Sequence, residues 1–327
     1  MCRGPLITLN NGVRMPSLGF GTLDRSAVEQ AAGAVQYAIA NGYRLIDTAA
    51  SYGDERQVGE GIRASGIDRS EMFITAKLWM ADYGYESALR AFDVSLRKLG
   101  LDYLDLYPLH WPMPSNFEAT IASYKAAETL LADGKVRAIG VSNFGPMHLE
   151  TLMERTEVCP AVNQIELHPY FIQRKMRETN SRYGIVTESW SPLGRSVRDA
   201  IASSTLKDPL AHPIVIGLAA KYRKTPVQVV LRWHMDHGLV TIPKSFRPER
   251  IAENIDIFDF ALTADDIAAI DAMDMGLRGG PDPDRFDLSR TKYPGRRLGS
   301  RRVTVCLRYW QGVSAPSIGS MRRLRFR

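Results

Sequence analysis

The sequence has little cysteine and no long apolar run. Its 327 residues contain three cysteines, Cys2, Cys159 and Cys306, whose scattered positions fit neither a disulfide framework nor a paired-cysteine metal site. No stretch approaches the about 18 consecutive apolar residues of a transmembrane helix, and the first residues lack the apolar core of a secretory signal. We therefore expect a cytoplasmic protein with reduced thiols, no membrane span and no metal site.

Acidic residues are missing from the last part of the chain. Residues 290–327 contain ten Arg, one Lys and no Asp or Glu, whereas residues 1–289 contain 31 basic and 36 acidic side chains. The net charge of +6 thus combines a mildly acidic body with a basic tail, which argues against a nucleic-acid-binding body. We expect residues 290–327 to be poorly ordered; docking to an acidic partner or a nucleic acid stays open for this tail.

Short apolar runs alternate with amphipathic segments between residues 13 and 275. Val28, Ala32, Val35 and Ile39 recur at helical spacing, and similar patterns follow at 88–99 and 227–234. Runs rich in β-branched and aliphatic residues predict strands at 17–21, 43–47, 72–76, 103–109, 137–141, 161–166, 185–189 and 239–242. Strands that alternate with helices form parallel sheets, and eight of them favour a closed (β/α)8 TIM barrel over an open doubly wound sheet.

A β-hairpin is predicted before the first of these strands. Residues 6–16 contain Asn11-Gly12, a dipeptide typical of a type I′ turn. We expect this hairpin to close the N-terminal mouth of the barrel. The predicted organisation is one α/β barrel domain over residues 1–289 and a basic C-terminal extension over residues 290–327.

Polar side chains recur where the predicted strands end. They are Asp47, Lys77, His110-Trp111, Ser142-Asn143, Gln164, Glu166, Trp190-Ser191 and Lys244-Ser245. The carboxyl ends of all strands of a parallel barrel lie on one face, so these side chains are expected to meet at one cleft. The polarity of loops explains any one of them, but it does not explain the whole series.

Several longer motifs make the sequence similar to the aldo-keto reductase family. They are Gly19–Thr22, Ile46–Glu55, Thr75–Trp79, Leu109–Pro112, Ile139–Phe144, Val162–Pro169 and Ile242–Ser245. The resemblance covers residues 5–289, and Glu188–Gly194 looks most like bacterial 2,5-diketo-D-gluconate reductases, with Trp190 in place of the usual tyrosine. It implies an NADPH-dependent oxidoreductase that reduces aldehydes or ketones, including keto-sugar acids, to alcohols by hydride transfer.

The resemblance places a catalytic tetrad on Asp47, Tyr52, Lys77 and His110. Hydride addition to a carbonyl leaves an alkoxide, which requires a proton donor in an electropositive pocket. Tyr52 would be this general acid, and the Lys77 ammonium would lower its pKa from about 10 by roughly 3 units. Asp47 would hold Lys77, and His110 would orient the substrate carbonyl.

The resemblance also implies residues that bind the cofactor, NADPH. They are Ser142, Asn143 and Gln164 at the carboxamide, Trp190 beneath the nicotinamide, Ser191, Leu193 and Phe246 as further contacts, Lys244, Ser245 and Arg250 at the 2′-phosphate, and Glu253 and Asn254 at adenine. Two cations and a hydroxyl suit a dianionic phosphate. From residue types alone, Trp190 as core packing and the phosphate cluster as a solvated helix start remain open.

The substrate side of the cleft is expected to be aromatic. The implied lining residues are Phe20, Trp79, His110, Trp111 and Phe144. Large apolar walls around a small polar floor suit small aldehydes and ketones. Barrel-mouth core packing stays open as an alternative for Phe20 and Phe144.

Two other functions stay open beside the reductase. One is a non-catalytic NADPH-binding regulatory subunit that docks a partner through its basic tail, and the other is a nucleic-acid-associated protein that acts through the same tail. The intact tetrad favours an enzyme with a small carbonyl substrate, and we expect a monomer. The G-x-G-x-x-A sequence at Gly59–Ala64 follows polar residues rather than a strand, so it predicts an exterior helix instead of a dinucleotide site.

Overall fold

Eight parallel strands lie at the centre of the computed structural model, which describes residues 4–194 and 208–288. They are β3 (Gly19–Gly21), β4 (Leu45–Asp47), β5 (Phe73–Thr75), β6 (Leu104–Leu109), β7 (Val136–Ser142), β8 (Val162–Glu166), β9 (Val186–Trp190) and β10 (Val240–Thr241). Each strand pairs with the next in chain order, and a parallel bridge between Leu18 and Thr241 joins β3 to β10. The sheet therefore closes into the predicted (β/α)8 barrel, with a strand at each predicted segment.

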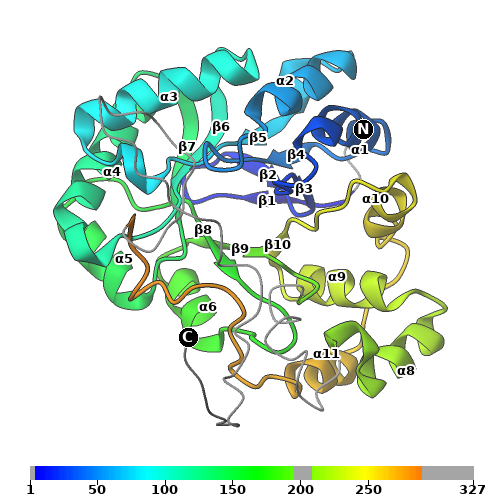
Figure 1. The fold of residues 1–327 in the computed structure, drawn as a ribbon. Coiled ribbons are helices and arrows are strands. Elements are labelled where there is room, and N and C mark those ends of the chain that lie inside the picture. The colour runs from blue at the N-terminus through cyan, green and yellow to red at the C-terminus, as the bar shows by residue number, and fades with distance from the viewer. Residues whose placement is uncertain (1–3, 195–207, 289–327) are drawn as a thin grey trace, which may run out of the picture. The chain divides into compact units, whose positions relative to one another are not determined.

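Helices surround the strands (Figure 1). They are α1 (Ala31–Ala40), α2 (Glu55–Ala64), α3 (Tyr85–Leu99), α4 (Phe117–Ala132), α5 (Pro146–Met153), α6 (Arg174–Arg182), α8 (Pro213–Tyr222), α9 (Pro226–Asp236), α10 (Pro248–Ile255) and α11 (Ala264–Asp271). The described residues belong to one compact unit, residues 1–290. The predictions about the basic tail fall outside the described residues, and the domain boundary at residue 289 stays a prediction.

Local capping signals explain where several helices begin and end. The Thr225 hydroxyl accepts a hydrogen bond from the Gln228 N–H at the start of α9, and the Gln228 side chain accepts one from the Thr225 N–H. This reciprocal pair satisfies two N–H groups that have no partner within the helix. At the other end of a helix, α3 stops at Gly100, which adopts a left-handed φ of 68° that glycine reaches without strain.

The glycines of the G-x-G-x-x-A sequence lie within α2, in an exterior helix as predicted. A Cβ atom at Gly59 would lie 2.1 Å from the Leu99 carbonyl oxygen of α3, and one at Gly61 would lie 2.4 Å from the Ala32 carbonyl oxygen of α1. Larger residues at these two positions would therefore push the neighbouring helices away. The two glycines therefore allow close packing of α2 against α1 and α3.

The N-terminal hairpin consists of β1 (Leu6–Thr8) and β2 (Arg14–Pro16), which pair antiparallel as predicted. Its buried side chains Leu9 and Met15 pack against an apolar layer inside the barrel. This layer contains Leu45, Phe73, Leu106, Ala138, Val162 and Val240. Because these residues lie in the amino-terminal parts of their strands, the hairpin closes the N-terminal mouth of the barrel.

The predicted type I′ turn of this hairpin is wrong. The connection has five residues, Leu9–Val13, and the Leu9 N–H donates to the Val13 carbonyl over 2.8 Å. A type I′ turn requires positive φ at both central residues, but of Asn11 and Gly12 only Gly12 has it, at 85°. The Asn11 side chain donates to the Arg137 carbonyl of β7 over 2.9 Å, so a tertiary contact holds the turn in another conformation.

Alternation along the strands decides which side chains enter the barrel. Val186, Glu188 and Trp190 alternate along β9, and Val186 and Trp190 pack in the interior cluster with Val162 of β8. Residues two apart in a strand point to the same face, so Glu188 enters the interior as well. The interior therefore changes from apolar next to the hairpin to polar at the carboxyl ends of the strands.

We predict that Met15→Ala destabilises the protein by about 2–5 kcal/mol, because it removes a fully buried side chain and leaves a cavity. Urea unfolding followed by circular dichroism measures this loss of unfolding free energy. The control is Leu6→Ala in the same hairpin, where the side chain is 37% exposed and the expected loss is small. Equal losses for the two variants would contradict the closing role of the hairpin.

Candidate active site

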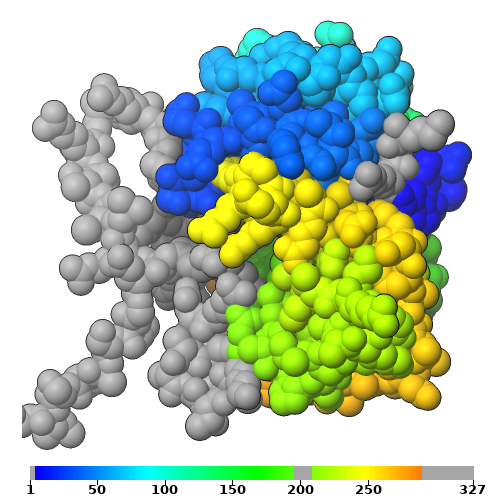
Figure 2. Space-filling model, turned by 90° about the vertical axis from the view of Figure 1, so that its right-hand side faces the viewer, coloured from blue at the N-terminus to red at the C-terminus, as the bar shows by residue number. Residues whose placement is uncertain are grey.

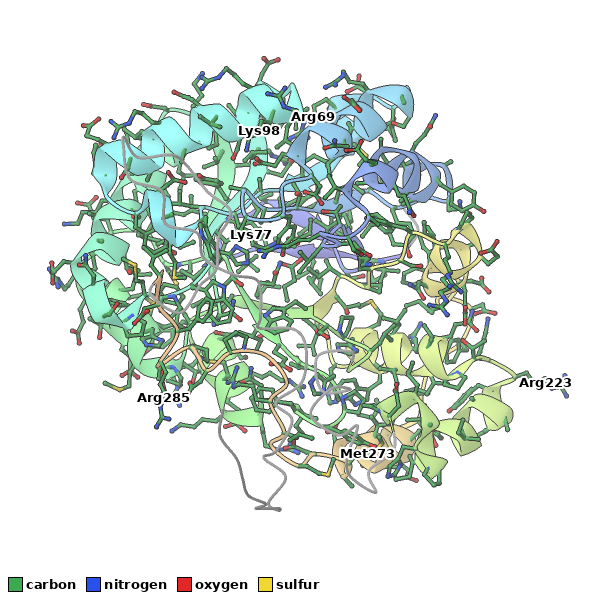
Figure 3. The ribbon with its side chains drawn as sticks, in the orientation of Figure 1. Arg69, Lys77, Lys98, Arg223, Met273 and Arg285 are labelled. Carbon is green, nitrogen blue, oxygen red and sulfur yellow. The ribbon has the colours of Figure 1, made fainter. Side chains whose placement is uncertain are left out.

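The four tetrad residues lie together at the carboxyl ends of β4, β5 and β6. The Lys77 Nζ atom is 2.5 Å from Asp47 Oδ1 and 3.3 Å from the Tyr52 hydroxyl oxygen. The rings of Tyr52 and His110 meet edge to face with their centroids 5.7 Å apart. Lys77 lies near the middle of the barrel, whereas Arg223 and Arg285 lie at its periphery (Figure 3). The four tetrad side chains are therefore in contact with one another at the strand ends.

Lys77 is a fully buried ammonium group whose three hydrogens all have acceptors. Besides Asp47 and Tyr52, it donates to the Thr48 carbonyl over 3.2 Å. Burial disfavours its charge, but the Asp47 carboxylate and the Tyr52 oxygen more than offset this and raise the pKa of Lys77. The Tyr52 oxygen accepts a hydrogen bond from Lys77, so the hydroxyl hydrogen of Tyr52 remains available to another acceptor.

The expected lowering of the Tyr52 pKa is wrong. Burial raises the pKa of Tyr52 to about 12, Lys77 opposes this rise, and Asp47 adds to it. The ammonium cannot offset burial because its charge is already balanced by the adjacent carboxylate. Tyr52 is consequently a neutral phenol at pH 7, which is the protonation state of a proton donor.

His110 is a neutral imidazole in this site. Burial, together with the charges of Lys77 and Arg25, lowers the pKa of His110 well below 6.5. Its Nδ1 atom lies 3.4 Å from the Ser51 hydroxyl. When this hydroxyl donates to Nδ1, the ring proton resides on Nε2.

Ser51 and Arg25 are parts of the site that the sequence analysis missed. The Arg25 guanidinium donates to the Ser51 carbonyl over 3.2 Å, which holds its charge beside the imidazole of His110. The position of Ser51 immediately before Tyr52 is a signal that could have identified it. Arg25 lies in the loop after β3 and has no such signal.

Ser142 and Asn143 connect the ends of four neighbouring strands. Asn143 accepts a hydrogen bond from the indole Nε1 of Trp190 over 2.8 Å and donates to the His110 carbonyl over 3.0 Å. The Ser142 hydroxyl donates to the Gln164 carbonyl over 2.9 Å. These bonds fix the half-buried indole of Trp190 beside the tetrad.

Gln164 extends into the barrel beneath the tetrad. Its Nε2 atom donates to Asp47 Oδ2 over 2.9 Å and to Glu188 Oε2 over 2.8 Å. An amide nitrogen has two hydrogens, so both are used. The carbonyl oxygen of the same amide, Oε1, has no hydrogen bond to a described residue, which leaves an acceptor for a ligand.

The predicted phosphate cluster lies between β10 and the first turns of α10. Lys244 and Arg250 are exposed, Ser245 is buried, and Lys244 Nζ pairs with Asp24 Oδ2 at 2.6 Å. Arg247, which was left open, is also exposed at the start of α10. Figure 2 shows α10 in yellow between the blue N-terminal helices and the yellow-green α8 and α9.

The remaining cofactor candidates are Ser191, Leu193, Phe246, Glu253 and Asn254. Ser191 has a positive φ of 53°, Leu193 packs against the outer core, and the Phe246 ring centroid is 4.9 Å from Lys244 Nζ. Asn254 is 4% exposed. The Glu253 carboxylate accepts a hydrogen bond from the Thr225 hydroxyl over 2.5 Å, so part of its hydrogen-bonding capacity is used within the protein.

Two of the aromatic residues assigned to the substrate surround His110, whereas two others pack elsewhere. Trp79 lies edge to face with His110 at 5.2 Å, and Trp111 follows it in the chain. Phe20 packs on Tyr43 at 5.8 Å, and both Phe20 and Phe144 belong to the core between strands and helices. Phe20 and Phe144 are therefore buried core residues, and their assignment to the substrate stays a prediction.

The segment 276–288 docks at the same end of the barrel. Glu166 at the end of β8 accepts hydrogen bonds from the N–H groups of Gly279 and Gly280 over 2.8 and 2.9 Å. The Phe286 ring lies 4.3 Å from that of Trp111. A Cβ atom at Gly280 would lie 2.5 Å from the Trp190 ring, so this position requires glycine.

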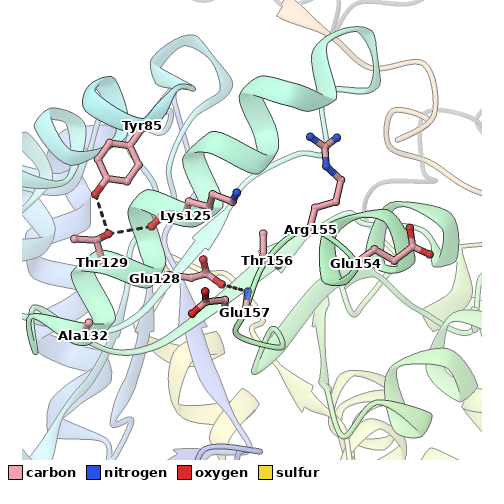
Figure 4. A pocket seen from close by; sticks show the side chains of 9 residues that line it. All are labelled: Tyr85, Lys125, Glu128, Thr129, Ala132, Glu154, Arg155, Thr156 and Glu157. Atoms are coloured by element: carbon pink, nitrogen blue, oxygen red, sulfur yellow. Dashed lines mark hydrogen bonds between the residues drawn. The ribbon is translucent and has the colours of Figure 1, made fainter.

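A surface groove of about 630 Å3 lies on the outside of the barrel (Figure 4). It is lined by Tyr85, Lys125, Glu128, Thr129, Ala132, Glu154, Arg155, Thr156 and Glu157. No predicted site residue is among these residues. The groove is therefore distinct from the tetrad.

The described residues contain neither a candidate metal site nor a candidate membrane-spanning helix. Within residues 4–194 and 208–288, no three or more His, Cys, Asp or Glu side chains are grouped so that they could hold a metal ion. None of the helices in the same ranges combines the length and apolar character that a membrane span requires.

The chain belongs to the Aldo/keto reductase family, whose profile matches residues 17–275. It is 55% identical over 289 residues to morphine 6-dehydrogenase of Pseudomonas putida, and the aligned region covers 88% of this chain and 97% of that protein. It is 46% identical to glyoxal reductase of Bacillus subtilis, over 86% of this chain and 96% of that enzyme.

A solved relative is the Bombyx mori aldo-keto reductase in complex with NADP. The two structures agree with a TM-score of 0.80 at 36% sequence identity, over 87% of this chain and 97% of the other. These findings confirm the family resemblance and the barrel. The finer likeness to 2,5-diketo-D-gluconate reductases stays a prediction.

We predict that Lys77→Met destabilises the protein by about 3–5 kcal/mol at pH 7, because it leaves the Asp47 carboxylate buried without its cation. The double variant Asp47→Asn with Lys77→Met should recover much of this loss, since no unpaired charge remains. Urea unfolding of the single and double variants measures the coupling. Additive losses would contradict a coupled pair.

Proposed function

We propose that this protein is an NADPH-dependent carbonyl reductase that converts aldehydes or ketones to alcohols. The observation that carries the proposal is the buried Lys77–Asp47 pair hydrogen-bonded to Tyr52, with the neutral His110 ring in contact with Tyr52. Family membership and the relative named glyoxal reductase support a carbonyl substrate. Cytoplasmic location and the monomeric state remain predictions.

The residues at the cleft fit NADPH. The Trp190 indole is held by Asn143 and offers a planar face for a nicotinamide ring. Gln164 Oε1 is an acceptor suited to the carboxamide NH2, and the exposed cations Lys244 and Arg250 suit the 2′-phosphate. The NADP complex of the Bombyx mori relative supports the same cofactor. When bound, NADPH supplies a hydride to the carbonyl carbon.

The residues of the tetrad would complete the reduction. The Tyr52 hydroxyl donates its proton to the carbonyl oxygen as negative charge develops there. The Lys77 hydrogen bond to the Tyr52 oxygen stabilises the phenolate that remains, and Asp47 keeps Lys77 charged and in place. His110 donates from Nε2 to the same carbonyl oxygen and so fixes its direction.

The aromatic side of the cleft favours small carbonyl compounds. Trp79, Trp111 and Phe286 supply apolar surface next to His110, which excludes water from the reacting carbonyl. Keto-sugar acids remain within the proposed range, because the Arg25 guanidinium beside Ser51 suits a substrate carboxylate.

We predict that Tyr52→Phe lowers kcat for NADPH-dependent reduction of small aldehydes by about 100-fold or more, because it removes the proton donor. NADPH binding, measured by quenching of tryptophan fluorescence, should change little. Tyr37→Phe, at a tyrosine 38% exposed on α1, is the matched control. Near-full activity of Tyr52→Phe would exclude Tyr52 as the acid.

We predict that replacing Lys244 or Arg250 by Met raises the KM for NADPH about 10-fold or more, since each removes a charged contact to phosphate. The KM for NADH should stay nearly constant, because NADH lacks the 2′-phosphate. Lys125→Met, at an exposed lysine of the outer groove, is the control. Parallel losses with both cofactors would contradict a 2′-phosphate site at these residues.

A further inference from the structure

Glu188 is a buried carboxyl group that the proposed mechanism does not use. It lies on β9 two residues before Trp190 and is 0% exposed. Strand alternation therefore directs Glu188 and Trp190 to the same interior face. An isolated carboxyl group in such a place is unfavourable unless hydrogen bonds or a proton compensate for the lost hydration.

One hydrogen bond links Glu188 to the tetrad. Its Oε2 atom accepts from Gln164 Nε2 over 2.8 Å, and the same nitrogen donates to Asp47 over 2.9 Å. The Glu188 Oε1 atom is buried and has no partner among the described residues. The amide of Gln164 thus lies between two carboxyl groups, one from β4 and one from β9.

This arrangement fixes the orientation of the Gln164 amide. The Asp47 carboxylate and the Glu188 Oε2 atom both accept from the NH2 group, and the amide oxygen would be repelled by the Asp47 carboxylate in its place. The Oε1 atom of Gln164 must therefore point away from both. Without Glu188, only Asp47 would define the orientation.

The charges around Glu188 come from two elements. Asp47 on β4 and Lys77 after β5 are the charged groups that act on it, while β8 contributes the neutral Gln164 and β10 places Val240 beside it. Burial raises the pKa of Glu188 to about 8, Asp47 raises it as well, and Gln164 and Lys77 oppose the rise. A pKa raised in this way favours the protonated form of Glu188 at neutral pH.

We propose, on the basis of the reductase function proposed above, that Glu188 is a positioning residue that orients Gln164 for the NADPH carboxamide and weakens the Lys77–Tyr52 pair when it ionises. The ionised form adds a second negative charge beside a single ammonium. Lys77 then stabilises the Tyr52 phenolate less, and proton donation slows. Activity is therefore expected to fall as the pH rises above neutrality, through the ionisation of Glu188.

Two substitutions separate orientation from charge. Glu188→Gln keeps an acceptor for Gln164 but cannot ionise; its kcat at pH 6.5 should stay within about 3-fold of wild type, while the alkaline loss shifts up by about one pH unit or more. Glu188→Leu removes the acceptor; its KM and Kd for NADPH should rise about 3- to 10-fold at every pH. Rescue of NADPH binding by glutamine but not leucine distinguishes orientation from space filling.

The matched control is Glu55→Gln. Glu55 is also buried, also has one carboxyl oxygen without a partner among the described residues, and pairs with Lys98 of α3 rather than with a tetrad residue. This variant should lose some stability but keep the wild-type pH profile and NADPH affinity. A pH shift as large as that of Glu188→Gln would overturn the assignment of the alkaline loss to Glu188.

The ionisation can also be measured without turnover. Infrared difference spectra of the wild type should show a protonated carboxyl band that disappears between pH 6.5 and pH 9.5 and is absent in Glu188→Gln. Absence of this band, or an unchanged alkaline limb in Glu188→Gln with unchanged NADPH affinity in Glu188→Leu, would overturn the proposal. A wild type that oxidises NADPH with none of a panel of carbonyl compounds would instead overturn the proposed function.

Discussion

The buried ion pair of Lys77 and Asp47 is the constraint on which the candidate active site depends. Both side chains are almost completely removed from water, with exposures of 0% and 1%. A charge pair in such a place is stable only when the remaining hydrogen-bonding groups are satisfied. The Thr48 carbonyl, the Tyr52 oxygen and the Gln164 amide satisfy them, so the need to stabilise one pair organises three further residues around it.

The same network explains why the polar residues extend deeper than the tetrad. Asp47 has a second oxygen that must accept a hydrogen bond, and Gln164 supplies it. The second hydrogen of that amide in turn requires the acceptor Glu188. Asp47, Gln164 and Glu188 therefore form a continuous polar network inside the barrel. It ends at the apolar layer that the hairpin residues Leu9 and Met15 cover.

The sequence predicted the barrel because each strand segment is a short buried run and each helix has local boundary signals. It predicted the tetrad because the motifs that carry Asp47, Tyr52, Lys77 and His110 resemble those of the aldo-keto reductase family. It could not predict the Tyr52 pKa, which depends on burial, or the turn at Asn11, which depends on β7. The assignment of Phe20 to the substrate overlooked strand alternation. Gly19 and Gly21 face Ile242 inside the barrel, so Phe20 between them points to the opposite side, toward the helices. Phe286 and Glu188 were missed because they act through partners in other elements, whereas Ser51 could have been identified from its position next to Tyr52.

The close approach of Gly280 to Trp190 links the loop that carries Phe286 to the proposed binding surface for nicotinamide. A change in that loop can therefore affect both. The loop of residues 276–288 carries Phe286 next to Trp111, while Trp190 belongs to the proposed nicotinamide platform. Exchange of this loop during evolution or protein engineering can alter the wall near Trp111 freely only while a residue without a side chain is kept at position 280. A grafted loop with a larger residue at position 280 would displace the indole. A change in activity would then reflect impaired coenzyme stacking as well as altered substrate preference.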